Sequence, residues 1–460
     1  MQDLKLVYYG DDFTGSTDCL EVLATNGLRT VLFLRIPDEK LIEERFPDAE
    51  CIGIAGTSRA QARDEMSREL LPALEFLWGL PASLVHYKIC STFDSSPEVG
   101  SIGLVVDLVN EHFGHRVIPL LVGAPALKRY TVFANHFATV KDETFRLDRH
   151  PTMSRHPITP MDESDLRVLL SRQTSARIAH MDLFAQSGAW DAVRQRFDEL
   201  VSKDPGVVLF DVLDDERLAV AGELIWSHSS AGNRFVIGSS GIEYALASYW
   251  RKNRRGPVPG AFANQSVGPK QTLVLSGSCS PVTMNQIDFA LKHGFHGVRL
   301  PISEVQGEEQ RAAQAADKVI AEVLDAWGNG QSVVLFSALG PDDVVRDGPL
   351  DASGDDDSFR KSIGNRIGSW LGSLGRRIIS KAHVERVVVA GGDTSGYAVS
   401  QMNILALQMK QAIEPGGPLC VAYSEDEDVD PLEIVLKGGQ VGSDRFLLHV
   451  AEGTSAVPKG

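Results

Sequence analysis

Short apolar runs alternate along the chain with stretches that carry apolar residues at helical spacing. Leu4 to Tyr9 is apolar, Ser16 to Asn26 has a helical period, and Thr30 to Leu34 is apolar again, which predicts a βαβ unit. Further apolar runs cover Cys51 to Ala55, Leu84 to Ile89, Val117 to Val122, Arg177 to Met181, Val207 to Val212 and Phe235 to Ile237. Because continuous apolar strands that alternate with helices are typical of parallel sheets covered on both faces, the pattern predicts a doubly wound α/β fold.

The alternation stops between Arg251 and Lys270, a segment rich in basic residues, Gly and Pro that is typical of a domain boundary. It restarts with apolar runs over Thr272 to Leu275, Val298 to Leu300, Val333 to Phe336, Val387 to Ala390 and Val435 to Leu436. A chain of 460 residues is too long for one ordinary core. We therefore expect two doubly wound domains with mainly parallel sheets, over residues 1–250 and 271–460, joined by a linker over 251–270.

The charge balance argues against some classes of partner. The chain has 45 basic and 61 acidic residues, and the net charge of -16 disfavours nucleic acid and anionic membranes while permitting a small anion in a locally positive site. We see neither a signal peptide nor an apolar stretch of about 20 residues, so we expect a cytoplasmic protein. Assembly into a homo-oligomer stays open.

Neither a disulfide framework nor a cluster of metal ligands is indicated. The five cysteines lack the C-x-x-C spacing of zinc sites; they are Cys19, Cys51, Cys90, Cys279 and Cys420. His136, His150 and His156 are interpreted as loop residues near the active site, without a ligand role. We therefore expect no metal ion held by a protein cluster.

Polar side chains follow several strands of the first domain. Asp11 and Asp12 come directly after the first apolar run, Arg59 follows a later one, and Lys88 and Ser91 stand at the end of the next. Ligands of open α/β sheets bind at this edge, where two carboxylates serve as a base or orient hydroxyl groups, and cations neutralise an anionic substrate. The alternative is that one Asp caps the following helix and the other residues are solvated.

Glycine-rich turns follow strands of the second domain. Gly391 to Gly396 lies between an apolar run and a predicted helix over Tyr397 to Met409, and Lys437 to Gly442 follows another apolar run. Backbone N–H groups at such turns hold phosphates, and Ser276 to Pro281 adds hydroxyl donors. The turns do not have the spacing of dinucleotide or Walker motifs, so they favour another kind of nucleotide site, with ordinary helix caps as the alternative.

Together these motifs resemble the four-carbon acid sugar kinase family over nearly the whole chain. The four matching segments, in order, are Gly10 to Gly15, Gly277 to Thr283, Gly391 to Gly396 and Lys437 to Gly442. Pro157 to Met161 with Ser164, and Pro125 with Arg129, resemble further landmarks of the family. The resemblance implies ATP- and Mg2+-dependent phosphorylation of a small sugar acid in a cleft between the two domains, with the acid bound to the first domain and ATP to the second.

Carried over to this chain, the resemblance assigns roles to the motif residues. Asp12 would be the general base or orient the substrate hydroxyl, with Asp11 helping, and Arg59, Lys88 and Ser91 would bind the acid. The nucleotide would be bound by Ser278, Gly391, Gly392, Asp393, Thr394, Gly439 and Gly442.

The chain departs from the family at one substrate segment. Members usually carry Lys-Ile-Asp-Ser-Thr-Leu-Arg-Gly, whereas Cys90 and Asp94 here stand at the Asp and Arg positions. Losing a cation and gaining an acid favours a related or branched oxo-acid such as 3-oxo-isoapionate. The alternatives are a sensor that binds nucleotide and sugar acid without transfer, and a sugar-acid dehydrogenase, which would need a fingerprint that the chain lacks.

Overall fold

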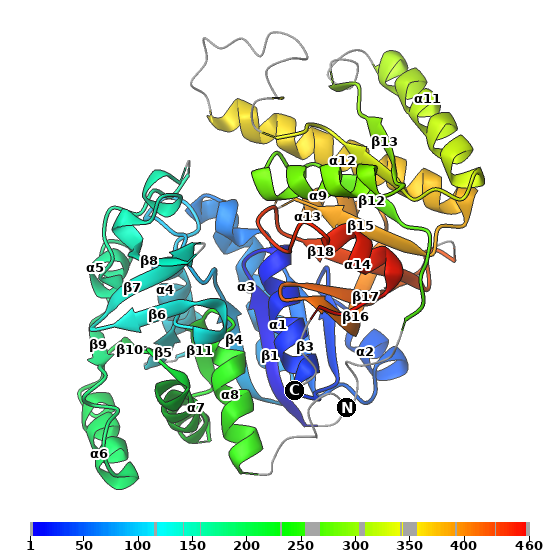
Figure 1. Ribbon diagram of the computed structural model, residues 1–460. Helices are drawn as coiled ribbons and strands as arrows, with labels where there is room; N and C mark the ends of the chain where they lie inside the picture. Colours follow the sequence, from blue (N-terminus) through cyan, green and yellow to red (C-terminus); the bar gives the residue numbers. More distant parts are fainter. Residues whose placement is uncertain are drawn as a thin grey trace. The chain divides into compact units, whose positions relative to one another are not determined.

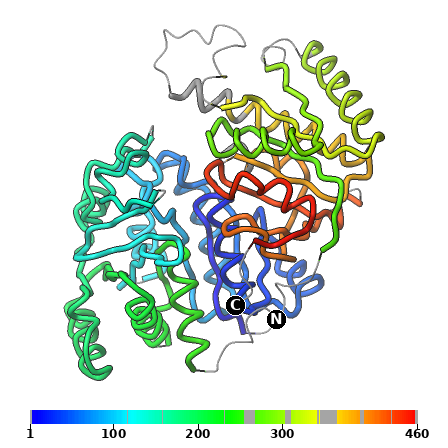
Figure 2. Tube along the Cα trace, in the orientation of Figure 1, coloured from blue at the N-terminus to red at the C-terminus, as the bar shows by residue number. Residues whose placement is uncertain are grey.

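The chain forms two compact units, one of Met1–Thr30 and Ile36–Pro259 and the other of Val31–Arg35 and Gly260–Gly460. The computed structural model describes residues 3–114, 117–140, 142–156, 158–230, 232–253, 267–302, 309–340, 343, 357–391, 393–427 and 429–456 (Figure 2). Most of the expected linker, residues 254–266, lies outside this part. Among the described residues, no helix is both long and apolar enough to cross a membrane.

The first unit is built on a parallel sheet with the strand order β3-β1-β4-β11-β5-β10-β9 (Figure 1). These strands are β1 (Leu4–Gly10), β3 (Cys51–Ala55), β4 (Ala82–Lys88), β5 (Ile118–Leu121), β9 (Ile178–Met181), β10 (Val207–Phe210) and β11 (Phe235–Gly238). Most of them are buried along their whole length, as expected for a sheet with helices on both faces. The helices are α1 (Phe13–Thr25), α2 (Glu39–Arg45), α3 (Arg63–Gly79), α4 (Ile102–Phe113), α5 (Leu166–Ser171), α6 (Trp190–Val201), α7 (Asp215–Ser229) and α8 (Gly241–Lys252).

The second unit has the strand order β13-β14-β12-β15-β18-β17-β16-β2, parallel from β13 to β18 and antiparallel beyond it. The strands are β2 (Thr30–Phe33), β12 (Leu273–Ser276), β13 (His296–Arg299), β14 (Val333–Phe336), β15 (Arg386–Ala390), β16 (Ile404–Glu414), β17 (Gly417–Ser424) and β18 (Leu432–Lys437). The helices are α9 (Pro281–Lys292), α11 (Glu309–Gly328), α12 (Asp357–Ala382), α13 (Asp393–Ser400) and α14 (Phe446–Glu452). The mainly parallel strands within each unit confirm the α/β prediction.

One expected element is wrong, and one expected strand pairs differently. The helix expected over Tyr397 to Met409 ends at Ser400, and the chain then enters the antiparallel strand β16. The two strands and the helix of the expected βαβ unit are present as β1, α1 and β2, but β1 pairs with β3 and β4, whereas β2 pairs antiparallel with β16 through Leu32 and Leu407. In both places the local sequence fits more than one arrangement, and long-range pairing decides between them.

A small antiparallel sheet was not expected at all. It consists of β6 (Arg129–Val132), β7 (Asn135–Val140) and β8 (Glu143–Arg146), and it is visible in Figure 1 beside the main sheet of the first unit. His136 lies in β7 and is fully buried, which corrects the expectation that it is a loop residue. The strands are short and carry many polar residues, so they lack the apolar runs that identified the others.

Candidate functional site

The predicted polar residues of the first unit meet at the carboxyl ends of three adjacent strands. Gly10 at the end of β1 lies opposite Ala55 of β3 and Lys88 of β4. The backbone N–H of Asp11 donates to the Lys88 carbonyl at 2.9 Å, and the Arg59 N–H donates to the Asp11 carbonyl at 3.1 Å. The fold therefore brings together the acids that follow β1, the cation that follows β3 and the cation that ends β4.

Asp12 is fully engaged by its neighbours. It caps α1 by accepting the Gly15 N–H at 2.9 Å, and it also accepts the Thr14 hydroxyl at 2.7 Å and Nη1 of Arg59 at 2.9 Å. Burial alone would raise the pKa of Asp12, but the charges of Arg59 and Lys88 outweigh it and hold this pKa below its ordinary value. Asp12 is therefore a carboxylate with little capacity to take up a proton.

Asp11 has the opposite surroundings. Its residue is 3% exposed, and its Oδ1 atom has no hydrogen-bond partner among the described residues. Burial, followed by the negative charge of Asp12, raises the pKa of Asp11 to about 7. A carboxyl group that exchanges its proton near neutral pH and has an oxygen without a partner is suited to general-base catalysis.

Lys88 is buried beside these carboxyl groups. A methyl group at Gly15 would lie 2.6 Å from Nζ of Lys88 and 2.3 Å from Oδ1 of Asp12, so only glycine lets the lysine approach the start of α1 this closely. Burial would lower the pKa of Lys88, but acidic neighbours that include Asp18 and Asp11 raise it. Lys88 is therefore a fixed cation at the base of the site.

The segment after β4 adds an acid and a thiol to the site. Thr92 donates its hydroxyl to Oδ1 of Asp94 at 2.7 Å, and burial together with Asp94 raises the pKa of Cys90 to about 12. Nε2 of His136 donates to the carbonyl of Ser91 at 2.8 Å. The predicted substrate residue Ser91 is thus held in place through its backbone.

Three further residues lie near this edge: Asp18 was not singled out from the sequence, Arg129 was named only as a family landmark, and His136 only as a loop residue near the active site. Asp18 lies within electrostatic range of Lys88, and its place one helical turn after Thr14 on α1 is a signal that could have identified it. Arg129 interacts with Asp94, and its buried Nε has no partner among the described residues. His136, like Arg129, comes from the small antiparallel sheet, so only the fold reveals where it lies.

In the second unit, the three predicted loops join through backbone contacts. Gly277 donates to the Ala390 carbonyl at 3.1 Å, and Gly391 donates to the Lys437 carbonyl at 3.0 Å. The hydroxyl of Ser280, which caps α9, donates to the Gly439 carbonyl. The loops that follow β12, β15 and β18 therefore lie together at the carboxyl ends of their strands, where open α/β sheets bind ligands.

Small residues keep the backbone of these loops accessible. A methyl group at Gly439 would lie 2.9 Å from Oγ of Ser278, so glycine keeps this backbone accessible, and Oγ of Ser276 is buried without a partner among the described residues. Gly442 lies in the same turn, with a φ of 88°. Of the remaining predicted residues, Gly392 lies outside the described part, and Asp393 and Thr394 begin α13 with side chains that are not described.

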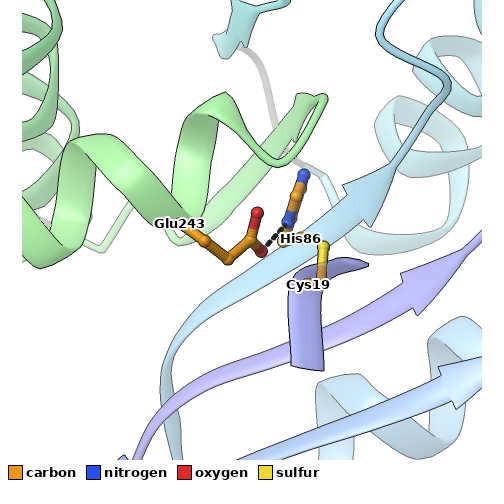
Figure 3. A group of neighbouring side chains, drawn as sticks. All are labelled: Cys19, His86 and Glu243. Carbon is orange, nitrogen blue, oxygen red and sulfur yellow. Dashed lines mark hydrogen bonds and ion pairs between the residues drawn. The ribbon is translucent and has the colours of Figure 1, made fainter. Parts of the chain in front are cut away.

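One buried group in the first unit has ligands typical of a metal site. The ligand atoms of Cys19, His86 and Glu243 lie within 4.8 Å of one another (Figure 3). However, Nδ1 of His86 is 2.7 Å from Oε1 of Glu243, whereas two ligands of one tetrahedral zinc ion are about 3.3 Å apart. Nε2 of His86 also contacts the Gly238 carbonyl at 3.1 Å. We interpret the group as a hydrogen-bonded pair beside a thiol.

The chain matches two family models and several curated kinases. A model described as a sugar-binding N-terminal domain matches residues 6–246, and one described as a nucleotide-binding C-terminal domain matches residues 273–447. A 3-oxo-isoapionate kinase of Paraburkholderia graminis is 45% identical over 98% of this chain and 95% of that protein. A 3-oxo-tetronate kinase of Methylobacterium radiotolerans is 28% identical over 96% of this chain and 97% of that protein.

Two solved structures share the fold. A Salmonella typhimurium protein described as a putative tRNA synthase has a TM-score of 0.77 at 23% identity, covering 97% of this chain and 98% of that chain. A Haemophilus influenzae protein has a TM-score of 0.69 at 22% identity, covering 96% of this chain and 98% of that chain. At these identities the two structures support the architecture alone.

Proposed function

The chain belongs to the four-carbon acid sugar kinase family, and we propose that it transfers the γ-phosphoryl group of ATP to a hydroxyl of 3-oxo-isoapionate or a closely related sugar acid. Phosphorylation of an alcohol group of a small sugar acid is the activity of the family. The observation that carries the choice of substrate is the 45% identity to a 3-oxo-isoapionate kinase over 98% of this chain, against 28% for a 3-oxo-tetronate kinase.

The two adjacent acids divide the work on the substrate hydroxyl. Asp11 accepts the hydroxyl proton, because its pKa of about 7 lets it exchange protons near neutral pH. Asp12 stays ionised and holds Arg59 at 2.9 Å, so it positions a cation. This division exchanges the roles expected from the motif, in which Asp12 was the base and Asp11 its helper.

The cations of the first unit bind the carboxylate of the acid. Arg59 and Lys88 stand at neighbouring strand ends, and Arg129 offers a buried Nε–H without a partner among the described residues. Asp94, within electrostatic range of Arg59 and Arg129, limits the net positive charge of the pocket. A sugar acid that also donates a hydrogen bond to Asp94, from a hydroxyl or a hydrated carbonyl, is therefore favoured over an acid without such a donor.

The nucleotide is held by the loops of the second unit. Backbone N–H groups at the start of α13 and in the Gly439 turn, with the hydroxyl of Ser278, would bind the phosphates. When bound, ATP supplies the phosphoryl group and Mg2+ neutralises charge on its phosphates.

ADP formation with a panel of sugar acids tests this function. We expect turnover with 3-oxo-isoapionate and a kcat/KM at least about tenfold higher than with 3-oxo-tetronate, since one misplaced substituent costs about 1 to 3 kcal/mol. A reversed ranking would overturn the assigned substrate. Nucleotide binding without ADP formation for any acid in the panel would favour the sensor instead.

A further inference from the structure

Lys437 is a buried amine at the junction of the three nucleotide loops. It ends β18 and is completely buried, although lysine is rarely buried without a charged partner. Its Nζ donates to the Thr283 hydroxyl at 3.1 Å, and Thr283 donates in turn to the Gly439 carbonyl at 3.0 Å. Its own carbonyl accepts the Gly391 N–H at 3.0 Å. One residue thus contacts α9, the turn after β15 and, through Thr283, the turn after β18.

The surroundings of this amine provide little compensation for a positive charge. From α9 it meets the uncharged Thr283 hydroxyl, and from α14 it meets the ring of Phe446 at 5.9 Å. Among the described residues, the charged group that acts on it is Glu414 at the end of β16, which is already engaged by Ser443 and by Nδ1 of His449 at 2.8 Å. Burial therefore lowers the pKa of Lys437 to about 8.

An aliphatic side chain would fill this space at lower cost than an amine, so the amine calls for a functional explanation. We propose that Lys437 is a positioning residue of the nucleotide site: its amine holds the loops together through Thr283 and takes up a proton when the phosphates of a nucleotide bind. The proton comes from solvent, and the negative phosphates favour the charged form of the amine. The inference rests on the proposed nucleotide site and adds to it a group that senses the phosphate charge.

Calorimetric titration of the full chain with ADP, in two buffers of different ionisation enthalpy, measures this proton directly. The terminal phosphate of ADP is fully ionised at pH 8, so it takes up no proton there. We expect an uptake of about half a proton per ADP at pH 8 and much less at pH 7, where the amine is already mostly charged.

Three variants separate titration of Lys437 from a structural role. Lys437→Met loses the uptake and binds ADP more weakly, whereas Lys437→Arg binds ADP without uptake because the guanidinium is always charged. Lys410→Met is the matched control, since Lys410 pairs with Glu433 at 2.7 Å and makes no hydrogen bond to the described residues of the nucleotide loops. This control keeps the uptake of the parent protein.

The outcomes that would overturn the inference are distinct from failure of the proposed function. If the parent protein binds ADP with no uptake at pH 8, or Lys437→Met keeps the uptake, Lys437 does not titrate with binding. If Lys437→Met does not fold, the proton uptake of the parent protein at pH 7 and pH 8 still tests the inference, because equal uptake at the two pH values would contradict it. If the parent protein binds no ADP, the nucleotide site itself is wrong.

Discussion

Asp11 and Asp12 are neighbours in the chain, but the fold gives them different chemistry. Asp12 accepts hydrogen bonds from Thr14 and Gly15 and pairs with Arg59, so it is held as an anion. Asp11 keeps one buried oxygen without a partner among the described residues. Adjacent acids whose pKa values are driven apart are a frequent basis for assigning acid and base roles.

Asp11→Asn tests the proton acceptor. For the parent protein, kcat/KM rises with pH through about 7, because Asp11 accepts a proton only when ionised. We expect the variant to lose about 100-fold or more in kcat/KM, and to lose this rise as well. Initial rates between pH 5.5 and 8.5 measure both effects. A variant that keeps the rise near pH 7 would show that another group takes the proton.

Asp12→Asn should affect the pH profile in a different way. Removing the charge of Asp12 removes one cause of the raised pKa of Asp11, so the rise in kcat/KM moves to lower pH. The activity also falls, because Arg59 loses its contact with Asp12. The same rate series gives the midpoint, and a midpoint that stays near 7 would contradict the coupling between the two acids.

At the scale of elements, β7 supports the substrate segment through one buried histidine. Nε2 of His136 donates to the Ser91 carbonyl at 2.8 Å, and Nδ1 contacts the Thr131 hydroxyl at 3.0 Å. Both contacts suit a neutral ring, and burial lowers the pKa of His136 to about 4. Through these two hydrogen bonds the small antiparallel sheet holds the backbone of Ser91 in place at the site.

Lowering the pH should reduce the stability of the fold, because it protonates His136 in the unfolded chain first. The pKa of His136 is lower in the folded protein than in the unfolded chain, so the unfolded chain binds more protons between about pH 6.5 and 4, and stability is lost as pH falls through this window. Between pH 7 and pH 5, protonation of this histidine should lower the free energy of unfolding by about 2 kcal/mol.

Urea unfolding at the two pH values measures the effect, and we expect His136→Gln to reduce the drop. The exposed His112, replaced in the same way, is the control and should leave the drop unchanged. If His136→Gln and the parent protein show equal drops, His136 is not the group responsible.

How much of these elements could be predicted depended on their local pattern. The central strands have continuous apolar runs, and the strand-end residues Asp11, Arg59 and Lys88 followed from them. The strand β16 was mistaken for helix because the short α13 precedes it without a marked stop. The sequence placed His136 near the site and marked Arg129 as a family landmark, but it could not give their contacts with Ser91 and Asp94, which arise only through tertiary packing.

At the scale of the whole molecule, the two units are not two consecutive stretches of chain. Val31–Arg35 belongs to the second unit, although 1–250 was expected as one domain. Phe33 and Leu32 pair with Ala406 and Leu407 of β16, and the Leu34 N–H donates to Leu405 at 3.0 Å. A segment from the start of the chain therefore covers the edge of a sheet formed by its end.

A fragment of residues 267–456 lacks this covering strand. An uncovered apolar edge promotes pairing with other chains, so we expect the fragment to self-associate. Appending residues 29–36 through a Gly/Ser linker should reduce the association. Light scattering coupled to size-exclusion chromatography measures both proteins. A monomeric fragment without the strand would show that β2 is dispensable for the second unit.

The central claim is phosphoryl transfer to the sugar acid, and the product itself tests it most directly. The protein is incubated with ATP labelled with oxygen-18 in the γ-phosphoryl group and with 3-oxo-isoapionate, and the products are analysed by mass spectrometry. The account predicts one labelled phosphoryl group on the acid for each ADP formed. Labelled inorganic phosphate with unmodified acid, or no ADP at all, would contradict it.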